Sequence, residues 1–254
     1  LPSKASAYGE LARCYLYMGD YANADAYADS ALALNSQLND LSTITGSISS
    51  ANYPVRKNDP EILLSKVVIQ GVAYSSTAMR LSDTLLKELG KKDLRYQLFT
   101  QNGAAAVYDP ADTASYYFAK DVFLGESRNI GPSVPEMMLI KAEYYARNNQ
   151  PADAMTWVNK LRMKRFKATD YVALTASSAD DALKIVIQER DREFFCRNIR
   201  WWDMRRLKDD SRFSETLTRT IMGTTYTLAP SSNRYVFPIA AWNLQLNPEI
   251  EPNP

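Results

Sequence analysis

Residues 189–208, ERDREFFCRNIRWWDMRRLK, place two adjacent tryptophans among many charged side chains. Such a segment can either bind a ligand or hold a fold together. The helix predicted over about 178–196 leads into it, and apolar residues recur along this helix in a stripe that includes Arg190. We therefore expect Arg190 on the buried face of the helix, which indicates a structural role for the stretch.

The partner predicted for Arg190 lies on an earlier helix. A buried guanidinium must be paired and hydrogen-bonded. The apolar stripe at 139–146 contains one carboxylate, Glu143. The pattern therefore predicts a Glu143–Arg190 ion pair between packed helices, with Trp201 and Trp202 anchoring the helix that follows.

Residues 1–36 predict a helical hairpin. Within it, the segment 15–34, YLYMGDYANADAYADSALAL, has the glycine turn and the alanine ladder typical of a tetratricopeptide repeat. A partial second copy occurs within 132–210, where Ala142 aligns with Ala12 at an offset of 130 residues. Because an insert separates the copies, the pattern argues against a continuous superhelix.

The insert, residues 37–131, begins with a polar, turn-rich segment. We expect a short strand or short helix at 61–71, a helix bounded by positions 82–90, and a hairpin of short strands around 109–110. Residues 211–254 predict an extended C-terminal strap, because prolines recur after position 237. The fold class is therefore mainly α, with helical hairpins, an irregular and partly β insert, and this strap.

Composition removes several classes of function. The chain has no histidine, which excludes histidine-based catalysis and histidine metal sites. Cys14 and Cys196 are too few for a thiolate zinc site; they form one disulfide or two thiols, and we favour two buried thiols. The formal net charge of +1 argues against a nucleic-acid binder. We expect no catalytic residue, no metal and no cofactor.

Four ordered motifs resemble SusD/RagB-like proteins. The stretch 189–208 resembles the family's Glu-Arg pair, which precedes an aromatic residue, a Trp-Trp-Asp run and further arginines. LRYQLF (94–99), MMLIKAEYYARNN (137–149) and VFPIAAWNLQLNPEIEPNP (236–254) resemble other family segments. The departures are Ala240, where a second proline is usual, and Asn198, where glycine is frequent. Family members are typically longer, so the resemblance implies an N-terminal part with a lipidated cysteine upstream.

The resemblance implies one SusD-like α/α superhelical domain over 1–254 and a cell-surface lipoprotein of Bacteroidetes-type bacteria. Such proteins cover a TonB-dependent, SusC-like outer-membrane transporter and capture oligosaccharides, or sometimes peptides, for import. They are binding proteins and not enzymes. Their contact with the membrane is made only through the lipid anchor, which would lie outside this segment, and their localisation is the surface of the outer membrane.

An oligosaccharide ligand would stack its apolar sugar faces on exposed aromatic rings while polar groups bond its hydroxyls. The insert supplies candidates of both kinds, so we expect ligand contacts at Tyr53, Arg56, Asn58, Tyr74 and Tyr108, with Tyr116 and Tyr117 as further tyrosines. One alternative is a helical-repeat scaffold that binds a peptide or partner protein. Another is a carbohydrate-active enzyme using the carboxylates Glu189 and Glu193, although the arginines around them favour salt bridges.

Overall fold

The computed structural model describes residues 2–68 and 79–252. It divides into two compact units, Leu1–Arg200 and Trp201–Pro254, and each is described by itself below. No helix of the described residues is both long and apolar enough to cross a membrane. The structure is mainly helical, which confirms the predicted fold class.

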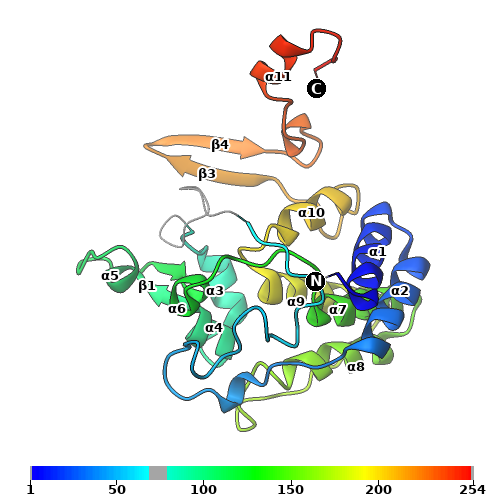
Figure 1. Ribbon diagram of the computed structural model, residues 1–254, viewed down its shortest axis with the longest axis vertical. Coiled ribbons are helices and arrows are strands. Elements are labelled where there is room, and N and C mark those ends of the chain that lie inside the picture. The colour runs from blue at the N-terminus through cyan, green and yellow to red at the C-terminus, as the bar shows by residue number, and fades with distance from the viewer. Residues whose placement is uncertain (1, 69–78, 253–254) are drawn as a thin grey trace. The chain divides into compact units, whose positions relative to one another are not determined.

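The first hairpin consists of α1 (Lys4–Met18) and α2 (Tyr21–Leu34) (Figure 1). The side chain of Ser3 caps α1, and Gly19 ends it with φ 78°, a left-handed conformation that glycine adopts without strain. Ala24 and Ala28 have no exposed surface. Because their side chains are small, the backbones of neighbouring helices can approach α2 closely. This confirms the hairpin predicted over 1–36.

The second hairpin consists of α7 (Val134–Arg147) and α8 (Pro151–Arg162). Proline starts α8, where its missing N–H would have no intrahelical partner. Helix α2 packs directly on α7, so the two hairpins are neighbours in space. The insert therefore does not keep the two hairpins apart in space, because the chain leaves the helical layer at residue 35 and returns to it at α7.

The insert contains only short elements: η1 (Leu41–Thr43), α3 (Asp83–Leu89), α4 (Leu94–Phe99), β1 (Thr100–Asn102), α5 (Gly103–Ala106), β2 (Tyr116–Phe118) and α6 (Lys120–Leu124). Ser82 caps α3 and Gly90 ends it, as predicted. Strands β1 and β2 pair in antiparallel register, which confirms a hairpin there, but residues 104–106 are helical. The described part of 61–71 makes isolated bridges at Ile62 and Val67 in place of a strand.

Helix α9 (Ala179–Phe194) begins at Ser178, whose side chain accepts a hydrogen bond from the backbone of the first turn. It packs against α7 and α8. Arg190 is 1% exposed, which confirms its predicted burial, and Glu143 on α7 is 0% exposed. Helix α10 (Ile199–Arg206) follows, and the division between the two units falls within it.

The unit Trp201–Pro254 contains an antiparallel hairpin of β3 (Leu217–Ile221) and β4 (Thr224–Leu228), then η4 (Asn233–Tyr235) and α11 (Ala241–Leu246). The ring of Trp201 lies 4.8 Å from that of Tyr235 and 6.1 Å from that of Phe237, centroid to centroid. The predicted strap was therefore correct in its short extended pieces and wrong over 241–246, which are helical.

Candidate functional site

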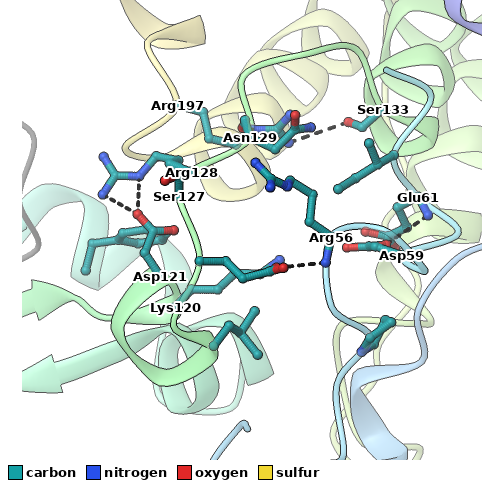
Figure 2. Close-up of a pocket in the computed structure, with 15 residues that line it drawn as sticks. Arg56, Asp59, Glu61, Lys120, Asp121, Ser127, Arg128, Asn129, Ser133 and Arg197 are labelled. Atoms are coloured by element: carbon teal, nitrogen blue, oxygen red, sulfur yellow. Dashed lines mark hydrogen bonds and ion pairs between the residues drawn. The ribbon is translucent and has the colours of Figure 1, made fainter. Parts of the chain in front are cut away.

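A cavity of about 90 Å³ lies among the loops of the insert, within the unit Leu1–Arg200 (Figure 2). It is lined by side chains from residues 54–62, from residues 118–129, and by Ser133 and Arg197. The first of these segments lies in the first half of the insert, the second includes α6, and Arg197 follows α9. Residues far apart in the sequence therefore meet at one place.

Backbone contacts bring the two sides of the insert together beside the cavity. The N–H of Val134 donates to the carbonyl oxygen of Glu61 over 2.8 Å. A Cβ atom at Gly131 would collide with the carbonyl oxygen of Leu64. Only glycine therefore allows the two chain segments to approach this closely without a shift of the backbone.

Two of the carboxylates that line the cavity are held in ion pairs. Glu61 Oε1 lies 2.8 Å from Arg165 Nη2, and Asp121 Oδ2 lies 2.7 Å from Arg128 Nη2. Burial raises the pKa of the Glu61 carboxyl, although Arg165 acts in the opposite direction. Burial likewise raises the pKa of Asp121, again against its arginine. Both charges are thus neutralised within the protein.

The two other acidic side chains on the cavity wall accept hydrogen bonds from neutral groups. Asp59 Oδ1 accepts from Asn39 Nδ2 over 2.8 Å. Glu126 Oε2 accepts from the backbone N–H of Arg56 over 2.7 Å, which ties α6 and its following turn to the first segment. Both carboxylates therefore serve to order the loops around the cavity.

Lys120 approaches the cavity from the N-terminal residue of α6. Its Nζ donates to the hydroxyl of Tyr53 over 2.8 Å and lies 4.4 Å from the centre of the Tyr53 ring and 4.6 Å from that of Phe99. Burial lowers the pKa of this ammonium group below its usual value. The aromatic rings supply a cation–π environment for Lys120 but no compensating negative charge.

Arg197 enters the cavity from the opposite side, after the end of α9 (Figure 2). Its Nε and Nη2 donate to the backbone carbonyls of Asn129 (3.1 Å) and Gly131 (3.0 Å). Desolvation lowers the pKa of the guanidinium. These neutral acceptors fix its orientation and leave its charge without a bound carboxylate.

Among residues 2–68 and 79–252, no carboxylate oxygen lies within 4.0 Å of the charged nitrogens of Arg56, Lys120 or Arg197. Every acidic side chain on the described cavity wall is engaged elsewhere, as the preceding contacts show. The cavity wall therefore combines two carboxylates in ion pairs, two carboxylates bonded to neutral groups, and three cations without a direct ion pair.

A buried network of ion pairs connects the cavity wall to the helices that surround it. Arg165 Nη2 contacts Glu61 and also Glu193 Oε1, each over 2.8 Å. Glu193 in turn contacts Arg95 Nη1 over 2.6 Å, and Arg95 contacts Glu189 over 2.8 Å. Burial alone would raise the pKa of Glu193, but Arg165 and Arg95 lower it to about 2. The network links helix α9 to the cavity wall through Arg165.

Glu189 and Glu193 therefore have no room to act as a catalytic pair. The side chain of Glu189 is 0% exposed and that of Glu193 is 7% exposed. Neither lines the cavity. Among the described residues, no group of three or more cysteine, aspartate and glutamate side chains is arranged to hold a metal ion.

The structure distributes the five predicted ligand residues over different environments. Arg56 lines the cavity. Tyr53 is 2% exposed and packs edge-on against Phe99, so only its hydroxyl, through Lys120, reaches the cavity. Asn58 is exposed beside the cavity-lining segment, and Tyr108 is 88% exposed. Tyr74 lies outside the described residues.

The predicted structural residues are placed as follows. Glu143 and Arg190 are both buried on packed helices, and Glu143 also forms an ion pair with Arg147 over 2.8 Å. The Glu143–Arg190 pair itself stays a prediction. Trp201 and Trp202 are both partly buried in the second unit.

Both cysteines are thiols. Cys14 is exposed, so its predicted burial was wrong, because its position on α1 turns away from the stripe that faces α2. Cys196 is partly buried, and burial raises the pKa of its thiol to about 12. Neither thiol lines the cavity.

Comparisons with known proteins agree with this architecture. Residues 135–254 match the model of the SusD family. A SusD superfamily protein from Parabacteroides distasonis superposes with a TM-score of 0.70 at 16% identity, over 99% of this chain and 63% of that one. A SusD superfamily protein from Bacteroides thetaiotaomicron superposes with a TM-score of 0.70 at 19% identity, over 98% and 60%.

A third solved structure is described as a SusD-like carbohydrate binding protein from Bacteroides vulgatus. It superposes with a TM-score of 0.62 at 18% identity, over 96% of this chain and 58% of that one. The chain thus spans less than two thirds of the length of each of these structures. None of the curated proteins compared with the chain matches it. The family match and the shared fold confirm the resemblance to SusD/RagB-like proteins.

Proposed function

We propose that this SusD/RagB-like chain captures nutrient glycans at the cell surface and delivers them to a TonB-dependent, SusC-like transporter of the outer membrane. The fold and the family match support this proposal. A structural neighbour described as a carbohydrate binding protein supports a sugar ligand. In this account the protein binds its ligand without transforming it and is anchored to the membrane by a lipid outside this segment.

The observation that carries the proposal is the polar cavity in the insert. Stacked hairpins form a rigid frame, and the loops of the insert supply charged and polar groups at one place. Loops on a rigid scaffold are where proteins commonly place binding residues. Sugar hydroxyls require donors and acceptors of this kind, and Arg56, Lys120 and Ser133 provide them.

The aromatic rings that stack on the sugar would lie outside the cavity. Tyr53 supports Lys120 from within the core and offers no exposed ring face. The ring of Tyr108 is accessible to a sugar, and we retain it as a proposed contact together with Asn58 and Tyr74. The proposed site therefore joins a charged cavity to tyrosines on the surrounding loops.

The test is calorimetric titration of the 254-residue protein with a panel of oligosaccharides, followed by chromatography of the sugar after incubation. The proposal predicts saturable binding of at least one oligosaccharide, with the sugar recovered intact. Release of shorter sugars would indicate an enzyme. Failure of every oligosaccharide to bind would contradict carbohydrate capture.

A peptide-binding scaffold is the second candidate, and one observation favours it. The stacking of α2 on α7 removes the argument that the insert interrupts the helical layer. Titration with a library of short peptides distinguishes the two: saturable peptide binding in the absence of sugar binding would favour the scaffold.

A further inference from the structure

We propose that the cavity between Arg56, Lys120 and Arg197 binds the anionic group of an acidic sugar, a carboxylate or a sulfate. This inference rests on the proposed capture of carbohydrate and specifies the class of sugar. It is assigned from the balance of charges around the cavity, from the volume of the cavity, and from the way its cations are held.

Apart from the two ion pairs described below, the cavity wall carries three cations and two carboxylates, Asp59 and Glu126, which leaves an excess of one positive charge. Glu61 is paired with Arg165, and Asp121 is paired with Arg128. Of the described cations on the wall, Arg56, Lys120 and Arg197 have no carboxylate within 4.0 Å. Burying a charge without a counter-charge is costly. A ligand that brings one negative charge would recover part of this cost.

The volume of the cavity limits what can enter it. Pockets that enclose a whole small ligand usually have roughly 300–1,000 Å³, whereas this cavity has about 90 Å³. A molecule of water takes about 30 Å³ of liquid volume. The cavity therefore has room for one functional group of a few atoms and not for a sugar ring, so the ring would lie outside against the loops.

Two of the three cations, Arg197 and Lys120, are also held in position before any ligand arrives. The carbonyls of Asn129 and Gly131 fix the guanidinium of Arg197. The Tyr53 hydroxyl and two aromatic rings fix the ammonium group of Lys120. Figure 2 shows Arg56, Lys120 and Arg197 around the same cavity, each from a different segment. Preorganised donors bind an anion without a further ordering cost.

The geometry of these donors suits a group with two or three oxygens. A guanidinium presents its N–H groups in a fixed fork that matches carboxylate and other oxyanions, and an ammonium group adds a point charge. A neutral hydroxyl could accept two such bonds at most and would bring no negative charge to offset the excess positive charge. We therefore expect strong discrimination between an acidic sugar and its neutral counterpart.

Two matched pairs of probes test this by isothermal titration calorimetry. The first pair is an oligogalacturonate and its fully methyl-esterified form, which differ in the carboxylate charge and in one methyl group on each sugar. The second pair is a sulfated oligosaccharide and its desulfated form. We expect the acidic member of one pair to bind at least about tenfold more tightly, as charge-assisted hydrogen bonds allow. The pair that shows the preference identifies the anionic group.

Arg56→Gln is the decisive variant, because Arg56 is partly exposed and its charged group makes no ion pair with a described residue. We expect it to lose the preference for the acidic probe by about tenfold while binding of the neutral probe changes little. Lys57→Gln is the control, since Lys57 is adjacent, exposed and outside the cavity wall. Arg56→Lys should restore part of the preference.

The results of these titrations distinguish a failure of the acidic-sugar inference from a failure of the proposed carbohydrate capture. Equal affinity within both pairs would overturn the acidic-sugar inference and leave carbohydrate capture standing. Equal effects of Arg56→Gln and Lys57→Gln on the preference for the acidic probe would also overturn the acidic-sugar inference and leave carbohydrate capture standing. Failure of all four sugars to bind, with binding of a peptide, would overturn both proposals. Thermal melts of each variant would confirm that its fold is retained.

Discussion

Arg95 Nη1 and Glu193 Oε2 lie 2.6 Å apart in the folded chain, although 98 residues separate them in the sequence. The contact joins α4 of the insert to the end of α9. Glu193 is shared with Arg165, which also contacts Glu61 on the cavity wall. The carboxylates Glu189 and Glu193 of the stretch 189–208 are therefore part of the framework that positions the insert.

Removal of the Glu193 charge should lower the free energy of unfolding at neutral pH. It should also make that free energy change less as the pH falls into the acid range. The folded-state pKa of Glu193 is about 2, below the ordinary value of 4.5, because Arg165 and Arg95 outweigh its burial. Its contribution is thus present above pH 4.5 and is lost as pH falls toward 2. Glu193→Gln should destabilise the protein by about 3–5 kcal/mol at pH 7 and flatten the curve in this window.

Urea unfolding at a series of pH values measures both effects. Glu249→Gln is a suitable control, because Glu249 is exposed and its carboxylate forms no ion pair with a described residue. If Glu193→Gln and the wild type lost stability in parallel between pH 4.5 and 2, the lowered pKa of Glu193 would be refuted.

The ion pair between the two hairpins should also contribute strongly to the free energy of unfolding. Arg13 on α1 makes a two-pronged contact with Glu136 on α7, with distances of 2.7 and 2.6 Å. Arg13→Met would leave Glu136 buried without its partner and should cost about 3–5 kcal/mol. Arg212→Met, which removes a partly exposed pair with Asp210, should cost below about 1 kcal/mol. Equal costs in chemical denaturation would contradict this account.

The alanine ladder of α2 should tolerate no larger side chain. Ala28 has no exposed surface, whereas Ala26 on the same helix is exposed. Ala28→Leu should destabilise the protein by about 1–3 kcal/mol, because the core has no space for three more carbon atoms. Ala26→Leu should change stability by less than about 0.5 kcal/mol. Thermal denaturation measures both, and a harmless Ala28→Leu would show that the hairpins do not pack as described.

Tyr108 tests whether the loops outside the cavity contact the sugar. Its ring is 88% exposed, so Tyr108→Ala should leave the melting temperature unchanged. If the ring stacks on a sugar, the variant should weaken oligosaccharide binding by about 1 kcal/mol. Unchanged affinity in calorimetry would remove Tyr108 from the proposed site.

Local features of the fold could be predicted from the sequence because short-range physics determines them. Ser82 and Gly90 bound α3, and Ser178 starts α9, since capping residues act within one helical turn. The burial of Arg190 followed from helical periodicity. The helix at 241–246 is too short for its periodicity to be distinguished from that of the surrounding extended segments.

The cavity could not be predicted in the same way. Lys120 and Arg197 meet Arg56 only because the insert folds back onto the end of α9. No periodic pattern connects positions that far apart. Tyr53 was expected at the ligand because it lies in a polar, turn-rich segment, yet it is 2% exposed. In irregular segments, burial depends on long-range contacts and leaves no repeating signal.

We propose that sugar binds at the insert cavity, with its ring against the surrounding loops. Chemical-shift mapping of the isotope-labelled protein, titrated with the tightest-binding oligosaccharide, tests it most directly. We expect the largest amide shifts in residues 54–62 and 118–133 and at Arg197. Saturable shifts confined to α8 or to the unit Trp201–Pro254 would contradict it.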